Sequence, residues 1–478
     1  MYDVLSPDAN CFIDNDEVIA SLNEGKLLAA DRNAIASILD KAKNFKGLSH
    51  REAAVLMEVK DSGALEEIYS LAKQVKEHIY GRRIVIFAPL YLSDYCINNC
   101  SYCGYSSRNK DVRRRKLTQE QLREEVQFLE KLGHKRIALE TGEDPVNCPL
   151  DYVIESIRTI YDVKCESGTI RRVNANIAAT STEGYERLKE TDIGTYILFQ
   201  ETYHKPTYLA AHPQGPKHNY EWHTEAHDRA MAAGIDDVGI GVLYGLYDWK
   251  YDTVAMLMHA EHLEAVHGVG PHTISVPRMR AASGMAQDNF PHLVSDGHFK
   301  QLVAVLRLAV PYTGMILTTR ETSDFRNEVV AVGISQVSAG SCTGVGGYAS
   351  SNKLGEKIDS DASLVQFQTE DRRPPLEVLK DLLKGGYIPS YCTACYREGR
   401  TGDRFMQLAK SGQIANVCQV NAILTLQEYI EDYGDYELKE MGEVVIQREI
   451  NAIPNKSVQE KALEMLSGIK SGTRDLRF

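Results

Sequence analysis

The sequence lacks an excess of basic residues. Its 54 Lys and Arg residues are outnumbered by 66 Asp and Glu residues, which gives a formal net charge of −12 over 478 residues. Nucleic acids and anionic membranes both need a basic face, so this balance argues against either partner. The sequence also has no run of about 18 apolar residues, and its first residues lack the basic and then apolar pattern of a signal peptide. We therefore expect a soluble, cytoplasmic protein.

Internal repeats and low-complexity segments are absent too, and the patterning that is present predicts an α/β fold. Residues 1–80 are predicted to be helical, since Ser49 and Glu52 form a capping box and apolar residues recur at helical spacing between Leu65 and Ile79. From about residue 82, short apolar runs alternate with helical stretches, as in a (β/α)8 TIM barrel. The runs are 84–90, 136–140, 170–177, 195–200, 236–242, 272–277, 315–319 and 332–337. An open doubly wound sheet is the alternative.

This patterning predicts three parts of the chain. Residues 1–80 form an N-terminal helical appendage, and residues 81–350 form the barrel. Residues 351–478 are predicted to begin with a connector, which reaches about Tyr391 and is rich in charged residues and proline. The rest of that segment is predicted to be a mostly helical C-terminal extension.

Three cysteines lie close together just after the first predicted strand. Cys96, Cys100 and Cys103 have the spacing C-x3-C-x2-C. Three thiolates suit a 4Fe–4S cluster in which one iron has no protein ligand and can hold an exchangeable chelating ligand. Zinc is the alternative, but it usually takes four ligands, and no histidine lies between His78 and His134.

A second group of cysteines lies in the C-terminal extension. Cys392, Cys395 and Cys418 have the spacing C-x2-C-x22-C. A C-x2-C pair is common in zinc sites, but the last histidine of the chain is His298, and the extension has no fourth cysteine. A zinc ion would need a carboxylate or a remote ligand, whereas three thiolates suit a second 4Fe–4S cluster.

Polar residues follow several predicted strands, at the end of a barrel where active sites form. They are Glu143, Asn176, Glu201, Arg278, Arg320 and Ser341. Two arginines that face one pocket suit an amino-acid carboxylate. Solvated loop carboxylates and surface ion pairs are the alternative interpretation of these residues.

The C-x3-C-x2-C motif resembles the radical S-adenosylmethionine (SAM) superfamily. The resemblance implies that SAM chelates the open iron and that its reductive cleavage yields a 5′-deoxyadenosyl radical. It further implies that Tyr102 lies near the adenine, that Glu143 holds the SAM amine and that Glu201 binds the ribose. Asn176 is assigned to the same cofactor site. Thr141 stands where the superfamily's Gly-Gly-Glu element has its first glycine, which is a departure from the pattern.

Residues 274–278, 319–322, 340–343 and 345–348 resemble the aromatic amino-acid lyase branch of that superfamily. This branch holds the thiamine-pathway 2-iminoacetate synthases and the HydG family of FeFe-hydrogenase maturases. The resemblance implies a carbon–carbon lyase that cleaves the Cα–Cβ bond of L-tyrosine to p-cresol and dehydroglycine. Arg278, Arg320 and Ser341 are then the candidate substrate-binding residues.

The second cysteine group, placed after such a barrel, resembles the HydG family specifically. The resemblance implies that dehydroglycine is converted to carbon monoxide and cyanide for an iron precursor of the hydrogenase H-cluster. It also implies an additional iron at the second cluster, bridged by free cysteine and bound by a barrel histidine. His272 is the candidate, and it lies at the N-terminal end of the sixth predicted strand, opposite SAM. The second cluster must then close the bottom of the barrel, unless His272 merely caps its strand.

Other functions compatible with these motifs are a 2-iminoacetate-forming lyase of thiamine biosynthesis, a sulfur-inserting enzyme and a non-catalytic iron–sulfur carrier. The second cysteine group argues against the first of these. A carrier has no use for Glu143, Glu201 and Arg320 on one face of a barrel. The expected partners are L-tyrosine, SAM, a reductant protein and other hydrogenase maturation proteins.

Overall fold

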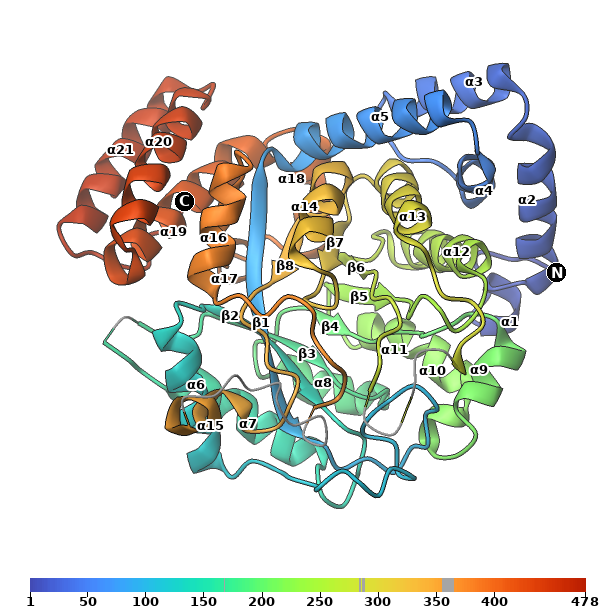
Figure 1. The fold of residues 1–478 in the computed structure, drawn as a ribbon, viewed down its shortest axis with the longest axis horizontal. Helices are drawn as coiled ribbons and strands as arrows, with labels where there is room; N and C mark the ends of the chain where they lie inside the picture. The colour runs from blue at the N-terminus through green and yellow to red at the C-terminus, as the bar shows by residue number, and fades with distance from the viewer. Residues whose placement is uncertain (167, 283–284, 286–288, 355–364) are drawn as a thin grey trace.

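The structure is a computed structural model that describes residues 1–478 except 167, 283–284, 286–288 and 355–364. Its centre is a barrel of eight parallel strands (Figure 1), which closes because β1 pairs with both β8 and β2. The strands are β1 (Arg83–Ser93), β2 (Arg136–Thr141), β3 (Arg172–Asn176), β4 (Tyr196–Ile197), β5 (Val238–Gly241), β6 (Thr273–Ser275), β7 (Gly314–Leu317) and β8 (Gln336–Ser338). The predicted TIM barrel is confirmed.

The start of the last barrel strand differs from the prediction. The sequence predicts a strand from residue 332, but Val332 is the last residue of α14 (Ser323–Val332), and β8 begins at Gln336. The Gly333 N–H still donates to the Val329 carbonyl at 3.2 Å, so the helix continues to this point. A short apolar run is compatible with a buried helix or a buried strand, and periodicity alone does not separate the two.

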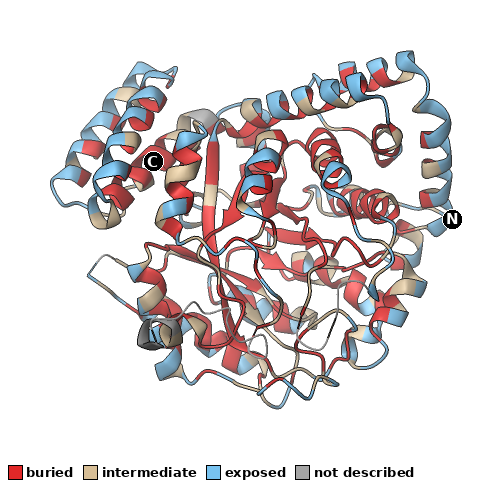
Figure 2. Cartoon of the chain, viewed as in Figure 1, coloured by how far each residue is buried: buried red, intermediate tan, exposed pale blue. Residues whose placement is uncertain are grey.

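Helices connect and cover the strands of the barrel. They are α6 (Gln119–Lys131), α7 (Leu150–Asp162), α8 (Thr182–Lys189), α9 (Lys205–Ala211), α10 (Tyr220–Thr224), α11 (Ala226–Ala232), α12 (Trp249–His267), α13 (Asp296–Ala309), α14 and α15 (Gly347–Leu354), with a short 3-10 turn at Pro216–His218. Figure 2 shows that the strands are buried, while the outer faces of the surrounding helices are exposed. Strands buried on both sides explain the nearly continuous apolar runs in the sequence.

The N-terminal helices pack on the outside of the barrel, against α12 and α13. They are α1 (Ala9–Phe12), α2 (Asn15–Leu28), α3 (Arg32–Ala42), α4 (His50–Glu58) and α5 (Ser62–Tyr80). The predicted capping box at Ser49 and Glu52 is present at the start of α4. His50 follows it and contacts two carboxylates, Glu17 at 2.9 Å and Glu261 at 2.7 Å, which ties α2, α4 and α12 together.

The segment predicted to be a connector contains regular structure. It forms α16 (Pro375–Lys384) and β9 (Ile388–Ser390), and only part of it, residues 355–364, lies outside the described residues. β9 runs parallel to the first residues of β1, with Arg83 opposite Ile388 and Val85 opposite Ser390. This pairing brings the following residue pair, Tyr391 and Cys392, to the N-terminal end of the barrel.

The rest of the C-terminal extension is helical, as predicted. It consists of α17 (Ala394–Arg397), α18 (Gly402–Lys410), α19 (Ile414–Tyr433), α20 (Tyr436–Asn451) and α21 (Lys456–Lys470). Figure 1 places α19 to α21 on the side of the barrel away from α2. Throughout the described ranges, none of the helices combines the length and the apolar character needed to cross a membrane.

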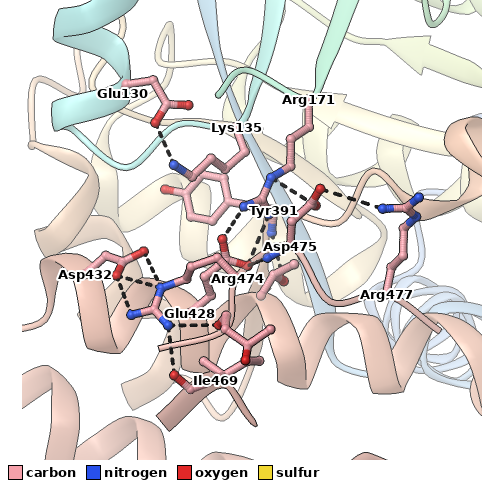
Figure 3. A network of polar contacts seen from close by, with 12 residues as sticks. Glu130, Lys135, Arg171, Tyr391, Glu428, Asp432, Ile469, Arg474, Asp475 and Arg477 are labelled. Carbon is pink, nitrogen blue, oxygen red and sulfur yellow. Dashed lines mark hydrogen bonds and ion pairs between the residues drawn. The ribbon is translucent and has the colours of Figure 1, made fainter. Parts of the chain in front are cut away.

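A buried network of charged residues joins the extension to the barrel (Figure 3). Arg171, just before β3, forms an ion pair with Glu428 of α19, and its Nε lies 3.2 Å from Asp475 in the C-terminal tail. Nearby, Lys135 contacts Glu130 at 2.6 Å, and Arg474 contacts Asp432 at 2.7 Å. These contacts fix α19, which carries Cys418, against the end of the barrel where the strands begin.

Candidate active site

A cavity of about 220 Å³ opens at the carboxyl ends of the barrel strands; we call it the upper cavity. The side chains that line it include Cys96, Cys100, Cys103, Tyr102, Glu140, Glu143, Asn176, Glu201, Arg320 and Ser341. The structure therefore brings the first cysteine group and most of the predicted site residues to one place. This is the face of a TIM barrel at which active sites form.

The loop after β1 carries the first cysteine group. Burial raises the pKa of the Cys103 thiol to about 11, and the neighbouring Cys96 adds to this effect. Burial, together with the neighbouring Cys103 and Cys96, also raises the pKa of the Cys100 thiol. Without a bound cation these thiols hold their protons, whereas a coordinating metal removes the proton from a thiol outright. The three thiols of Cys96, Cys100 and Cys103 on one cavity wall are suitable metal ligands.

The end of β2 approaches this cysteine loop closely. A side chain at Gly142 would lie 2.3 Å from the Tyr95 carbonyl oxygen, so only glycine fits there. The Ile97 N–H donates to the Glu143 carbonyl at 2.9 Å. The Glu143 carboxylate accepts a hydrogen bond from Asn98 Nδ2 at 2.5 Å, and burial raises its pKa. Asn98, which the sequence analysis did not identify, thus links the cysteine loop to Glu143.

Glu201 lies at the end of the fourth strand in a strained backbone conformation. Its φ is 68°, which is unusual for a residue with a side chain and is often associated with functional sites. Lys217 Nζ donates to Glu201 Oε1 at 2.7 Å, and the Glu201 carbonyl accepts from the Leu243 N–H at 2.9 Å. Lys217 is a second residue that the sequence analysis missed, because it lies 16 residues away in a loop.

Tyr102 also lines the upper cavity, and its hydroxyl is 2.7 Å from His212 Nε2. His212 Nδ1 lies 2.7 Å from the Tyr208 carbonyl oxygen, so this ring is held on both sides. Burial lowers the pKa of His212, which keeps its ring neutral. The neutral ring fixes the Tyr102 side chain beside the cysteine loop.

Arg320 and Ser341 are placed to bind a polar ligand in the upper cavity. The Arg320 guanidinium lies 3.4 Å from the centre of the Phe367 ring, and burial lowers its pKa to about 10. No carboxylate of the described residues forms an ion pair with it. The Ser341 hydroxyl is buried and has no hydrogen-bond partner there. A cation without a counter-ion and a buried hydroxyl without a hydrogen-bond partner both favour an incoming anionic or polar group.

Arg278 does not line this cavity, which corrects the prediction that it binds substrate. Its Nε donates to Glu321 at 2.9 Å, and Nη1 lies 2.7 Å from Asp296. The guanidinium also packs between Phe299 and Phe325, with each ring centre 4.8 Å away. These contacts use the charge of Arg278 inside the protein, so its role in the structure is packing.

Glu140, near the end of β2, is a further residue that the sequence analysis missed. It lines the upper cavity, and burial raises its pKa to about 8, although a hydrogen bond from Asn176 acts in the opposite direction. This carboxyl is therefore largely protonated at neutral pH and can donate a hydrogen bond. Its position within a strand drew no attention because the neighbouring Glu143 fitted a known motif.

A second cavity, of about 60 Å³, lies at the opposite end of the barrel; we call it the lower cavity. Cys392, Cys395 and Cys418 line it, together with His272, which directly precedes β6. His272 Nε2 is 2.8 Å from the Tyr396 hydroxyl, and Nδ1 is 3.4 Å from Asp237. Burial lowers the pKa of His272, so the ring is neutral, as a metal ligand must be. The structure thus brings His272 and the second cysteine group together.

Both cysteine groups fit iron–sulfur clusters in their donor chemistry. In the part of the chain that the structure describes, no three His, Cys, Asp or Glu side chains converge as ligands of a single metal ion. In a cubane each thiolate binds a different iron, so the thiols need to share a cavity wall rather than one point. Three thiols on the wall of each cavity match the three cysteine ligands of such a cluster.

Comparison with known proteins identifies the family. Residues 90–260 match the model of the radical SAM superfamily, and residues 275–388 match the biotin and thiamin synthesis associated domain. A 2-iminoacetate synthase of Salmonella typhimurium is 30% identical over 74% of this chain and 89% of that protein. A crystal structure of HydG, a maturase of the FeFe-hydrogenase, has a TM-score of 0.93 and 57% identity, covering 98% of this chain and all of the other. The chain belongs to the HydG family of radical SAM tyrosine lyases.

A second solved structure agrees with this assignment. HydG from Carboxydothermus hydrogenoformans has a TM-score of 0.79 and 36% identity, and the match covers 95% of this chain and 99% of that one. A radical SAM domain implies a 4Fe–4S cluster and SAM, and the upper cavity has a set of donors that fits both. The HydG match covers 98% of this chain, whereas the 2-iminoacetate synthase match covers 74% of it.

Proposed function

We propose that this protein cleaves the Cα–Cβ bond of L-tyrosine to p-cresol and dehydroglycine, and converts dehydroglycine to carbon monoxide and cyanide. These products become ligands of an iron complex that serves FeFe-hydrogenase H-cluster assembly. The observation that carries this proposal is the pair of cysteine-lined cavities at opposite ends of one barrel. The names of the similar proteins, a 2-iminoacetate synthase and a hydrogenase maturase, support both halves of the reaction.

In the upper cavity, Cys96, Cys100 and Cys103 would hold the first cluster. When bound, the cluster and SAM supply the radical that starts the cleavage of tyrosine. Glu143, oriented by Asn98, is placed to accept hydrogen bonds from the SAM amine. Glu201 is placed to accept hydrogen bonds from the ribose hydroxyls.

Lys217 and Tyr102 support this SAM site. The ion pair with Lys217, at 2.7 Å, fixes the orientation of the Glu201 carboxylate. Tyr102, held by His212, would form the wall beside the adenine, and Asn176 completes the same group of side chains.

Three side chains would position tyrosine. Arg320 lines the upper cavity and has no ion-pair partner in the described chain, so it would bind the substrate carboxylate. The Ser341 hydroxyl, which has no protein partner, would bind a second polar group of the substrate. Protonated Glu140 would donate a hydrogen bond without adding a negative charge near the carboxylate.

In the lower cavity, Cys392, Cys395 and Cys418 would hold the second cluster, and His272 would hold the additional iron. A free cysteine would be a further iron ligand. The neutral His272 ring can exchange its hydrogen bond with Tyr396 for a metal bond. The other partners would be a reductant protein and hydrogenase maturation proteins. A reducing, cytoplasmic environment would keep all ten cysteines out of disulfide bonds.

The test is the detection of both products from one reaction. Anaerobically reconstituted enzyme receives tyrosine, SAM and a strong reductant, p-cresol is quantified, and carbon monoxide is trapped on a ferrous haem protein. We expect both p-cresol and carbon monoxide. Formation of p-cresol and glyoxylate without carbon monoxide would instead identify the protein as a lyase that supplies 2-iminoacetate. The absence of p-cresol would refute the lyase assignment itself.

A further inference from the structure

The upper and lower cavities meet at one polar side chain. Gln336, the first residue of β8, lines both of them. Phe87, Ala138 and Ile316 form a small apolar cluster at this depth of the barrel, and Asn174 and Ser275 add polar side chains at the same strand register. A side chain at Gly314 would lie 2.6 Å from Gln336 Nε2, so the glycine leaves room for Gln336. Gln336 thus borders both cavities.

Arg136, the first residue of β2, lies next to Gln336 in the lower cavity. Its Nη2 donates to Gln336 Oε1 at a long 3.4 Å, and its Nε is buried with no hydrogen-bond partner. The side chain is only 4% exposed, and no carboxylate in the described ranges forms an ion pair with it. A buried guanidinium without a counter-ion is costly, which favours binding of an anion. The Nε and Nη2 edge is also the edge at which arginine binds a carboxylate with two parallel hydrogen bonds.

A neighbouring arginine, Arg83, also lines the lower cavity. Against the larger effect of burial, which raises the pKa of the Cys392 thiol, the charges of Arg83 and Arg136 both act to lower that pKa, so both arginines lie near the second cysteine group. Arg136 differs in that its side chain also donates to Gln336, the residue that borders both cavities.

We propose that Arg136 and Gln336 form a subsite for a small carboxylate, which holds the two-carbon fragment of tyrosine beside the second cysteine group. This inference rests on the proposed function, because cleavage of the Cα–Cβ bond leaves a fragment, HN=CH–COO⁻, with one carboxylate. Arg136 binds the carboxylate side-on, and the Gln336 amide contacts the carbon–nitrogen end.

The test uses oxamate, a stable planar anion that carries a carboxylate and an amide in the same arrangement. Oxamate is titrated calorimetrically into the anaerobically reconstituted enzyme without SAM, tyrosine or reductant. In Arg136→Gln we expect binding about ten- to a hundredfold weaker, because a charged pair of hydrogen bonds is lost. Arg136→Lys keeps the positive charge but loses the pair of parallel N–H donors, so its affinity for oxamate should be intermediate.

Two further variants control for folding and for location. Arg172→Gln removes a neighbouring guanidinium that pairs with Arg136 in the sheet register and is equally 4% exposed, but that lies behind the cavity wall, over the Tyr396 ring. It should bind oxamate as the wild type does. Gln336→Glu keeps the shape of the side chain and leaves Arg136 in place, but its carboxylate pairs with Arg136 and should exclude oxamate. Arg320→Gln should leave this binding intact, which separates the subsite from the upper cavity.

Iron and sulfide content is measured in every variant. Loss of oxamate binding with the full iron content of both clusters supports the subsite. Loss of binding together with iron of the second cluster overturns it, since Arg136 would then serve the cluster. Undiminished oxamate affinity in Arg136→Gln and Gln336→Glu overturns it as well.

Turnover separates this inference from the proposed function. Carbon monoxide release that persists unchanged in Arg136→Gln refutes the subsite and leaves the proposed function standing. A wild-type enzyme that binds oxamate through Arg136 but releases no carbon monoxide supports the subsite and refutes the conversion of dehydroglycine.

Discussion

Removal of the Glu428 carboxylate should loosen the C-terminal extension without affecting the upper cavity. The ion pair of Glu428 with Arg171 is buried, with side-chain exposures of 5% and 6%. Removing one partner of a buried pair typically costs about 3–5 kcal/mol, because the other charge is left uncompensated. Arg171 keeps Asp475 at 3.2 Å, but that side chain is 37% exposed and compensates only in part. We therefore expect Glu428→Ala to cost about 2–3 kcal/mol.

The assay is a double-mutant cycle on Arg171→Ala and Glu428→Ala, read by hydrogen exchange of α19 to α21. Because Cys418 lies on the same helix as Glu428, the variant should lose iron from the second cluster while it retains p-cresol formation. Glu431→Ala, on an exposed position of the same helix, is the matched control and should change neither quantity. Single-variant effects that add within about 0.5 kcal/mol would show that the pair is not coupled and would refute the reasoning.

Three further predictions concern the cavities. Burial raises the pKa of Glu140 to about 8, so the folded protein binds a proton that the unfolded chain releases, and stability should fall as pH rises from about 5 to 8. Denaturant unfolding at pH 6 and pH 8 should show a smaller fall in Glu140→Gln, and an equal fall would contradict the assignment. Arg320→Gln should raise the KM for tyrosine. Arg278→Gln should instead lower the midpoint of thermal unfolding, with little change in KM. A raised KM in Arg278→Gln and an unchanged KM in Arg320→Gln would make Arg278 the substrate ligand. Cys96→Ala should abolish both products, and Cys392→Ala should abolish carbon monoxide alone, unless both clusters are needed for SAM cleavage.

The parts of the site that the sequence predicts best are those with local spacing. Cys96, Cys100 and Cys103 fall within eight residues, so their spacing alone brings their thiols together in any loop. Cys392 and Cys395 are equally close, and the resemblance to a known family placed His272 opposite SAM. The structure agrees with that geometry, since His272 and the second cysteine group line the same cavity. The ligand roles of these residues, and the domain boundaries at 80 and 350, remain predictions.

Side-chain direction and distant partners were harder to predict. Arg278 follows a strand, as expected of a site residue, but its partner Glu321 lies 43 residues further along the chain and turns it away from the cavity. Glu140 was hidden because a buried strand residue looks like part of the core until the space beside it is known. The strand β9 has only three residues, too few for an alternating pattern to separate it from a connector.

The short strand β9 nevertheless has a large consequence for function. It adds to the N-terminal part of β1, and the chain then passes directly to Cys392 under the barrel. In most TIM barrels the chemistry is confined to the carboxyl ends of the strands, and the other end contributes stability. Here the extension gives that second end a cavity of its own, and Gln336 lines both cavities. Three residues of β9 thus decide that the second cysteine group lies at the end of the barrel opposite the first.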